Sequence, residues 1–512
     1  MLTFVIRRVI AAFFIVLGAT FIAYILMANA GDPLEAVRGI PDPGLRAQRM
    51  ASLSSALHLD VNPLARYFLW LKGVGGCFVG NCDFGQNITG GNVGQDLGTY
   101  IVVSLRLIIA ATVLAITIGI TIGVVTALKQ YSGFDYAVTF MTFVFFSLPV
   151  FWVGILLKDL VAIKFNNFVQ GGPTFTLTWI LILAIFFGIA AFSVLDGTFL
   201  RKLVIALIVA AVVAALAFYV SATHWLLDPK LGLPVIAVLA IAIAFGVTTL
   251  TSGIRNRKAL LSALITAVVG IALWYPLQLF FHDGMSYWKL ILLFVIALAV
   301  GMLVGYLVGG DDKGLNARTG AITAFGVAII IFIDRMMRAW NQYSTLLGGR
   351  PLATQGQSTP NLKGDFWIKL LDTATHLLLP TITLMLISLA THSRYARASM
   401  LEVMNQDYIR TARAKGLTHR TVVMRHAFRN ALIPMATIIA FDIAGLIGGA
   451  VLTETVYSYK ALGAMFQQGL VKNDPNPVMA FFVVSSLVAV IANLLADIAY
   501  ASLDPRIRVG ST

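Results

Sequence analysis

Long apolar runs alternate with short polar stretches along almost the whole chain. A helix that crosses a bilayer needs about 20 mainly apolar residues, and the sequence offers a run of that length again and again. These runs cover residues 8–28, 103–128, 136–160, 176–196, 203–222, 234–252, 259–281, 288–309, 320–336, 376–395, 432–453 and 478–502. The pattern therefore predicts an all-α polytopic membrane protein with about 12 transmembrane helices.

The first apolar run has two interpretations. Arg7 and Arg8 could form the basic region of a signal peptide, and residues 28–30 have the small side chains of a cleavage site. The run spans about 20 residues, however, whereas the apolar region of a signal peptide has about 7–15. Its length favours an uncleaved first helix.

Basic residues predict the orientation of these helices, because loops on the cytoplasmic side of a membrane are enriched in lysine and arginine. Arg7 and Arg8 place the N-terminus in the cytoplasm, and twelve crossings bring the C-terminus back to the same side. The other basic positions then also fall inside: Lys129, Arg201, Lys202, Arg255, Arg257, Lys258, Lys313, Arg318, the loop 396–431, Arg506 and Arg508.

Composition supports the membrane assignment. Hydrophobic residues make up 59% of the 512 residues and charged residues only 12%, about half of the roughly 25% charged residues in a soluble domain. The formal charge of +14 is explained by the cytoplasmic loops, so nucleic-acid binding is not needed to account for it. The two cysteines are too few for a metal-cluster scaffold.

Two long segments are expected outside the cell, at residues 29–102 and 337–375. The first holds an amphipathic stretch around residues 64–71, which predicts a short helix, and the second holds a loop at 348–360. Cys77 and Cys82 both lie in the first segment, where the environment is oxidising. They could form a small disulfide loop or remain two free thiols, and the sequence leaves both alternatives open.

The cytoplasmic loop 396–431 carries the most specific pattern. Asp407 can cap a short helix that starts at Tyr408, and Gly416 suits the left-handed position that ends a helix. Thr418 is a good N-cap for a second helix, 419–432. Small and basic side chains on the first helix fit a docking element for a cytoplasmic protein, or a hairpin whose cations contact anionic lipid headgroups.

Residues 407–417 (DYIRTARAKGL) and 425–434 (RHAFRNALIP) resemble the EAA loop of ABC importer permeases, in the form used by the dipeptide, oligopeptide and nickel branch. Gly416 matches the glycine of that loop, and Thr411 with Ala412 occupy its alanine pair. The glutamate of the general pattern would fall at Arg410, a departure that is typical of this branch.

Other segments resemble the B-type subunit of the same branch: residues 1–8, 30–33, 147–152, 448–457 and 503–508. The similarity covers about 1–168 and 340–508. Residues 458–463 depart from the family, which usually has a Trp-Pro-Gly-type turn there, so the detailed shape of the external gate is not carried over.

The resemblance implies a six-helix type I importer core into which about six further transmembrane helices are inserted. The first half of the core would occupy 1–173, the inserted block 174–336, and the second half, with the EAA-type loop, 337–512. An insertion between two external ends must contain an even number of crossings, and six satisfies this. Because the block has few intramembrane charges, which usually mark ion or substrate paths, we expect a peripheral lipid-facing bundle.

The resemblance also implies partners and a site. A second, homologous permease, two cytoplasmic ATPases and an extracytoplasmic peptide-binding protein would complete the importer in a bacterial cytoplasmic membrane, and the cargo would be di- or oligopeptides. The loop would couple to the ATPases through Asp407, Arg410, Thr411, Ala412, Arg413, Ala414, Lys415, Gly416 and Leu417.

The chain offers no enzyme chemistry of its own. No Gly-x-x-x-x-Gly-Lys-Ser/Thr motif occurs, so it has no P-loop for ATP, and ATP and Mg²⁺ would bind the partner ATPases. The histidines show no metal-ligand spacing, and we expect no catalytic residue, metal or cofactor. Asp442 and Asp497, within the last two helices, could be proton-relay groups or packed carboxylates, and we favour the second.

Three other functions remain as alternatives. A nickel or other small-solute ABC importer would share the same permease frame. An ion-coupled secondary transporter with 12 helices would fit the helix number, but it predicts paired repeats in the two halves, which the sequence lacks. A membrane scaffold without transport activity is the third.

Overall fold

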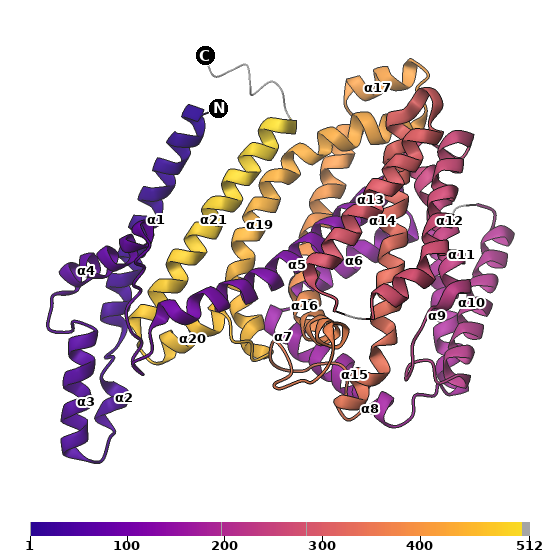
Figure 1. Ribbon diagram of the computed structural model, residues 1–512. Helices are drawn as coiled ribbons and strands as arrows, with labels where there is room; N and C mark the ends of the chain where they lie inside the picture. Colours follow the sequence, from indigo (N-terminus) through magenta and orange to yellow (C-terminus); the bar gives the residue numbers. More distant parts are fainter. Residues whose placement is uncertain (1, 196, 283, 504–512) are drawn as a thin grey trace.

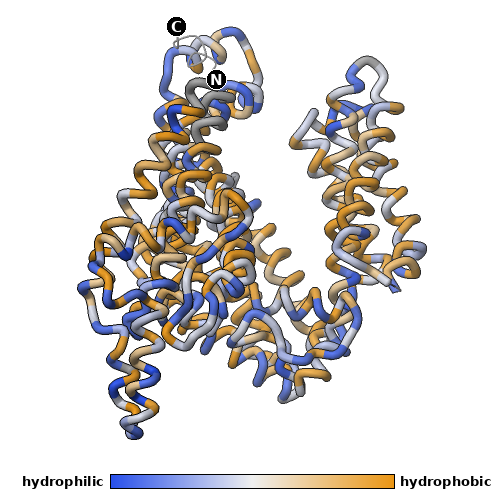
Figure 2. The backbone as a smooth tube through the Cα atoms, turned by 60° about the vertical axis from the view of Figure 1, so that its left-hand side comes forward, coloured by the Kyte–Doolittle hydropathy of each residue, from blue (hydrophilic) through white to orange (hydrophobic). Residues whose placement is uncertain are grey.

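The computed structural model describes the backbone of residues 2–195, 197–282 and 284–503, and their side chains except at 2–5, 36, 311, 444 and 496–503. The described part is built from helices, and the one β-bridge in it pairs Gln86 with Asn92. The helices run between two faces (Figure 1), named here the α17 face, at the top of the view, and the α3 face below. Hydrophobic residues follow the long helices, and hydrophilic ones gather at both ends (Figure 2).

The first third of the chain supplies three predicted spans and an unexpected set of short helices. The bounds are α1 Leu2–Ala30, α2 Glu35–Arg38, α3 Pro43–Ala56, α4 Pro63–Gly75, α5 Val93–Leu128, α6 Gly133–Ser147, α7 Val150–Leu156, a π-helical turn Leu157–Ile163 and α8 Lys164–Gln170. Helix α4 matches the expected amphipathic helix, whereas α3 was not predicted.

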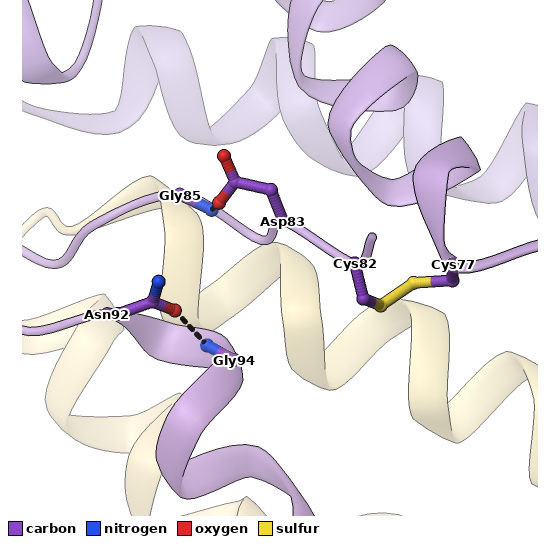
Figure 3. The surroundings of a disulfide bond; sticks show 6 residues. All are labelled: Cys77, Cys82, Asp83, Gly85, Asn92 and Gly94. Carbon is purple, nitrogen blue, oxygen red and sulfur yellow. Dashed lines mark hydrogen bonds between the residues drawn. A yellow bond between two sulfur atoms is a disulfide. The ribbon is translucent and has the colours of Figure 1, made fainter. Parts of the chain in front are cut away.

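Two of these spans differ from their predictions. Helix α5 begins at Val93, ten residues before the predicted start at 103, because Asn92 accepts a hydrogen bond from the backbone N–H of Gly94 (2.8 Å) and caps it there (Figure 3). The third span, predicted as one continuous helix over 136–160, is bent into two parts. Helix α6 and the helical stretch Val150–Gln170 meet at an angle of 105°, since Pro149 disfavours helical conformation at Leu148, which is extended.

The middle third consists of six long apolar helices at the predicted positions. They are α9 Leu177–Val194, α10 Phe199–Ala222, α11 Gly232–Thr251, α12 Arg257–Phe280, α13 Tyr287–Val308 and α14 Lys313–Arg338. Contrary to expectation they do not form a single bundle. Helices α11–α14 pack on one another, whereas α9 and α10 pair with each other and contact the rest mainly through α6.

The last third returns to the core. Its helices are α15 Trp340–Leu346, α16 Phe366–Met404, α17 Asp407–Ala414, α18 His419–Thr421, a π-helical turn Val422–Ala427, α19 Phe428–Val456, α20 Leu462–Val471 and α21 Pro475–Leu503. Ten helices of the described part are long and apolar enough to cross a membrane, or up to twelve if each of two bent pairs counts as one span. The predicted twelve is the upper end of that range.

The core closes across the middle third through helices α5 and α16. On α5, Gly119 leaves room for α16, because a Cβ there would lie 2.9 Å from the Cβ of His392. A Cβ on Gly123 would overlap the backbone oxygen of Ser393. Small residues let membrane helices approach closely and so increase van der Waals contact between them. This contact matters because lipid tails are as apolar as leucine, so the hydrophobic effect does not drive helices together within the bilayer.

Helix α4 is held against α1 by aromatic side chains. Tyr67 is fully buried, and its ring contacts Phe21 and Tyr24 of α1 at centroid distances of 5.2 and 5.7 Å. Its hydroxyl lies 3.0 Å from Oγ1 of Thr20 and donates to the backbone oxygen of Leu17. The segment that contains α4 is therefore fixed to α1.

The segment after α4 contains a disulfide. The structure joins Cys77 and Cys82, whose Cα atoms lie 4.0 Å apart, directly after α4 (Figure 3). The residues between them include Phe78 and Val79, which are 91% and 82% exposed. The disulfide thus closes a short loop with an apolar tip on the α3 face.

A single carboxylate ties the ends of three helices in the middle third. Asp334 of α14 is fully buried and accepts from the backbone N–H groups of Leu231 and Gly232, at the start of α11 (2.9 and 3.2 Å). It also accepts from Nε1 of Trp274 on α12 and from Nε of Arg338 (3.0 Å each). Because a buried charge needs several partners to offset its desolvation, this arrangement fixes the α11–α14 bundle at the α3 face.

Candidate coupling site

Helix α17 is amphipathic, and its two faces have different surroundings. Ile409 is fully buried and Ala412 nearly so, both against Val422, Val423 and other residues of a small cluster beneath the loop. The remaining predicted site residues are exposed: Asp407, Arg410, Thr411, Arg413, Ala414, Lys415, Gly416 and Leu417. Ala412 therefore anchors the helix, while the other eight form a surface that a protein can contact.

The start of α17 is not capped as predicted. The helix begins at Asp407, and Gln406 occupies the N-cap position without a side-chain hydrogen bond. The carboxylate of Asp407 instead faces Nη1 of Arg410 at 3.5 Å, with both side chains largely exposed. An exposed ion pair of this kind contributes about 0–1 kcal/mol, so the charges remain available to a partner.

The end of α17 follows the prediction. Gly416 has φ +74°, the left-handed conformation that glycine adopts without strain. A Cβ built on it would have no atom within 4 Å. The glycine is thus required by the backbone conformation and not by crowding. Thr418 then accepts from the backbone N–H of Thr421 (3.3 Å), as expected of an N-cap.

The helix that follows Thr418 does not stop at residue 432. It runs from α18 through the π-helical turn at Val422–Ala427 into α19 without a break in the helical path. Three successive helical segments, α then π then α, therefore connect the loop directly to a long apolar helix. Oγ of Ser399 donates to the backbone oxygen of Ala431 (2.9 Å), so α16 and α19 are linked at the base of the loop.

Two carboxylates bind neighbouring helices to α16. Asp442 of α19 accepts from Oγ of Ser388 (3.1 Å) and lies 3.0 Å from Nε2 of His392, whose side chain is fully buried. Asp135 of α6 accepts from Nε and Nη2 of Arg397, both at 2.8 Å. Asp442 is thus a packed carboxylate with donors on the neighbouring helix. The side chain of Asp497 lies outside the described residues, as do Arg506 and Arg508.

A buried glutamate lies at the opposite end of α19, beside residues 458–463, which depart from the family pattern. Glu454, near the end of α19, accepts from the backbone N–H groups of Gly463 and Ala464 (2.7 and 3.2 Å) and from Oγ of Ser104 on α5 (2.5 Å). Glu454 is 1% exposed. It therefore caps α20 and joins it to α5, contacts that apolar patterning does not predict.

A cavity of about 410 Å³ opens between α5, α16 and the segment around Tyr459. Arg106 of α5 is its one charged lining residue, and Thr99, Ser358 and Thr373 add hydroxyl groups. Sequence reasoning missed this site because Arg106 is a single basic residue within an apolar run. Among the described residues no group of three His, Cys, Asp or Glu side chains could hold a metal ion.

Comparison with known families identifies this architecture. Residues 234–509 match the model of the family described as "Binding-protein-dependent transport system inner membrane component". The chain belongs to this family. The resemblance seen in the loop is thus confirmed at the level of the family. The matched range starts within the segment expected to be inserted, so the boundary of that insertion stays a prediction.

Individual relatives cover shorter stretches. The oligopeptide transport system permease protein OppB of Mycobacterium tuberculosis is 47% identical over 154 residues, 30% of this chain and 47% of the relative. The dipeptide transport system permease protein DppB of Escherichia coli is 43% identical over 138 residues, 27% of this chain and 41% of the relative.

A probable peptide ABC transporter permease protein, y4tP of Sinorhizobium fredii, is 34% identical over 219 residues, 43% of this chain and 67% of the relative. The chain thus spans about half the length of the first two relatives and two thirds of the third.

Proposed function

We propose that the chain is a permease subunit of an ATP-driven ABC importer that carries di- or oligopeptides inward across a bacterial cytoplasmic membrane. Family membership and the peptide-transport names of the relatives support this assignment. The observation that carries the proposal is α17, which is anchored by two buried side chains and presents an exposed basic surface.

In this proposal the α17 face is cytoplasmic and both termini lie on that side. A second homologous permease completes the pathway, two ATPases bind ATP and Mg²⁺ beneath it, and an extracytoplasmic peptide-binding protein delivers the cargo to the α3 face. Arg410, Arg413 and Lys415 would meet an acidic rim on the ATPase, because opposite charges steer and orient docking.

The packing beneath α17 supports a route from the ATPase to the membrane. A displacement of α17 moves Ile409 and Ala412, which press on the π-helical turn that leads into α19. Ser399 and Ser388 connect α19 to α16, and Arg397 connects α16 to α6. Movement of the loop would therefore be shared among three helices of the core.

The cavity beside Arg106 is a suitable place for peptide in transit. A peptide carries a terminal carboxylate, and a guanidinium binds a carboxylate through two parallel hydrogen bonds. We expect Arg106→Gln to reduce uptake of peptides with a free C-terminus more than uptake of amidated ones, with the ATPases still bound.

Reconstitution of the complete complex tests the function. Proteoliposomes that contain this chain, its partner permease and both ATPases should accumulate labelled di- or oligopeptide only with binding protein outside and ATP on the ATPase side. Uptake that persists without ATP but follows an imposed ion gradient would instead identify a secondary transporter. ATP-dependent uptake of nickel without peptide would instead identify a nickel importer.

The orientation has a separate test that uses the cysteines. After mild reduction, a membrane-impermeant maleimide added to intact spheroplasts should label Cys77 and Cys82. A cysteine introduced at Thr411 in a chain without native cysteines should be labelled only after the membrane is opened. Labelling in the reverse pattern would contradict the proposed placement of the two faces.

A further inference from the structure

The α11–α14 bundle contains an apolar cavity of about 460 Å³ between α12, α13 and α14. Of its twenty lining residues, Thr266 is the one with a polar side chain, and its hydroxyl donates to the backbone oxygen of Ser262 within the same helix (2.9 Å). The cavity therefore offers an occupant no hydrogen bond along its walls. An apolar cavity of about 150 Å³ already binds benzene, so this one has room for a much larger apolar group.

The cavity arises from uneven packing of the three helices. Toward the α17 face, α13 and α14 touch along glycines, where a Cβ on Gly305 or Gly320 would overlap backbone atoms of the facing helix. Toward the α3 face the lining changes to larger side chains such as Leu277 and Phe294, and the helices leave space between them. The wall includes Ile291 and Ile296, which are 54% and 47% exposed. It thus borders the surface that faces the membrane.

A cation lies at the end of the cavity near the α3 face. Phe281 and Phe332 line that end, and both rings contact Trp367 at centroid distances of 5.2 and 6.0 Å. The guanidinium of Arg335 stacks on the same indole, 5.4 Å from its centroid. One aromatic ring therefore separates the apolar cavity from a positive charge.

Arg335 is the less engaged of two neighbouring arginines. Arg338 donates to Asp334, whereas Nε of Arg335 is buried without a hydrogen-bond partner among the described residues. Asp365, which also acts on Arg335 electrostatically, is used as the cap of α16 and accepts from the backbone N–H of Ile368 (3.0 Å). The guanidinium of Arg335 can thus still bind an anionic group.

We infer that the α11–α14 bundle holds a phospholipid with an anionic headgroup, one acyl chain in the cavity and its phosphate beside Arg335. Three observations support this occupant: the cavity lies within membrane-spanning helices, its wall borders the bilayer, and its end carries a cation. The helices on each side are candidate spans, so acyl chains are the apolar groups that surround it.

The site adds a role to the inserted helices that peptide transport does not require. It stands on α12–α14 and Arg335, and not on the coupling loop. A lipid bound there would join three helices of the bundle to Trp367 of α16, whose Nε1 donates to the backbone oxygen of Phe281 (2.9 Å). The lipid would thereby strengthen the attachment of the bundle to the core.

Two matched substitutions on α13 test the cavity. Ala297 lines it, whereas Ala299, two residues further along, is exposed and does not. We expect the complete complex with Ala297→Phe, purified in mild detergent, to retain about one phospholipid fewer than wild type by quantitative lipid mass spectrometry. Ala299→Phe should retain the wild-type amount. Equal retention in all three would overturn the proposal.

Two further measurements test the lipid site without relying on assembly of the Ala297→Phe complex. A phosphatidylglycerol probe with a diazirine in its acyl chain should crosslink wild type at residues 273–281 and 290–297. In nanodiscs of phosphatidylglycerol and phosphatidylethanolamine, Arg335→Gln should abolish enrichment of the anionic lipid, while Lys289→Gln, on an exposed basic residue of α13, should preserve it. Crosslinks confined to the outer helix surface, or to another protein, would contradict the inference.

Discussion

Arg397 and Asp135 form a two-pronged ion pair across 262 residues of sequence, with Nε and Nη2 each 2.8 Å from a carboxylate oxygen. Asp135 lies before the six middle helices and Arg397 after them. The side chain of Asp135 is 3% exposed and that of Arg397 is 30% exposed. The pair therefore fastens the two halves of the core independently of everything between them.

Breaking this pair should destabilise the protein. Since one partner is buried and the other partly exposed, we expect Arg397→Gln to cost about 2 kcal/mol, between the values for exposed and buried pairs. Asp135→Asn should cost a similar amount, and the double variant less than the sum. Thermal unfolding of the detergent-solubilised complex provides the measurement. The exposed pair Arg410–Asp407 serves as control, because its loss should leave the unfolding midpoint unchanged.

Removal of residues 174–336 should leave a core that still inserts and folds. The contacts that close the core, including Ser104 with Glu454, join residues on either side of the deletion. The segments that flank the deletion pack together, since the rings of Phe165 and Trp340 are 6.4 Å apart, and a glycine-serine linker should connect the new ends. Co-purification with the partner permease measures assembly, and loss of the complex would show that the middle helices are structurally required.

Substitution of Gly416 should uncouple ATP hydrolysis from transport. At φ +74° any other residue is strained, so Gly416→Val should disturb the end of α17 without a steric clash in the chain itself. We expect unchanged membrane insertion, and peptide uptake reduced at least tenfold. Gly314→Val is the control, since Gly314 is helical and also has open space around its Cβ position. Normal uptake with Gly416→Val would reject the coupling role.

Asp474 should make the contact between the α20–α21 turn and the segment around Ile88 sensitive to pH. Burial raises its pKa to about 6, although hydrogen bonds from the backbone of Ile88 and Asn476 and the nearby Lys472 act in the opposite direction. A raised pKa means that the folded protein binds the proton more tightly than the unfolded chain. The contribution of Asp474 to the free energy of unfolding is therefore full below about pH 4. It decreases as the pH rises toward 6 and is absent above that.

This contribution can be measured as a slope. Between pH 4 and 6 the thermal midpoint of wild type should fall relative to that of Asp474→Asn, whose amide cannot ionise, and the difference should stay constant from pH 6.5 to 8. Asp83→Asn alters an exposed carboxylate of the segment that Asp474 contacts through Ile88, and it should keep the wild-type slope. A wild-type slope in Asp474→Asn would assign the effect to another group.

Helix positions and the loop followed from sequence because they depend on local rules. Apolar length located the spans, and Gly416 with Thr418 located the break between α17 and the next helix. The bend between α6 and α7 was missed although Pro149 was visible, because one proline in a long apolar run permits either a kinked or a broken helix.

Partners of buried polar groups could not be predicted in the same way. Asp334, Asp442 and Glu454 each find donors on helices that are distant in sequence, and apolar patterning does not say which helices meet. The division of the middle third into a pair and a bundle was missed for a related reason. All six helices are apolar around most of their surface, so the sequence pattern does not distinguish a side that faces lipid from a side that faces another helix.

The α9–α10 pair is fastened mainly near its ends. On the α17 face Nζ of Lys129 donates to the backbone oxygen of Val194, and on the other face Nε1 of Trp340 donates to that of Leu226, just beyond α10. With 18 residues, α9 is about 27 Å long, slightly less than the hydrocarbon thickness of a typical bilayer of about 30 Å. A hairpin attached at both faces and surrounded by lipid along its length is put under tension when the bilayer thickens and relaxed when it thins. A change in bilayer thickness would thus pull on the permease core at both faces through this pair.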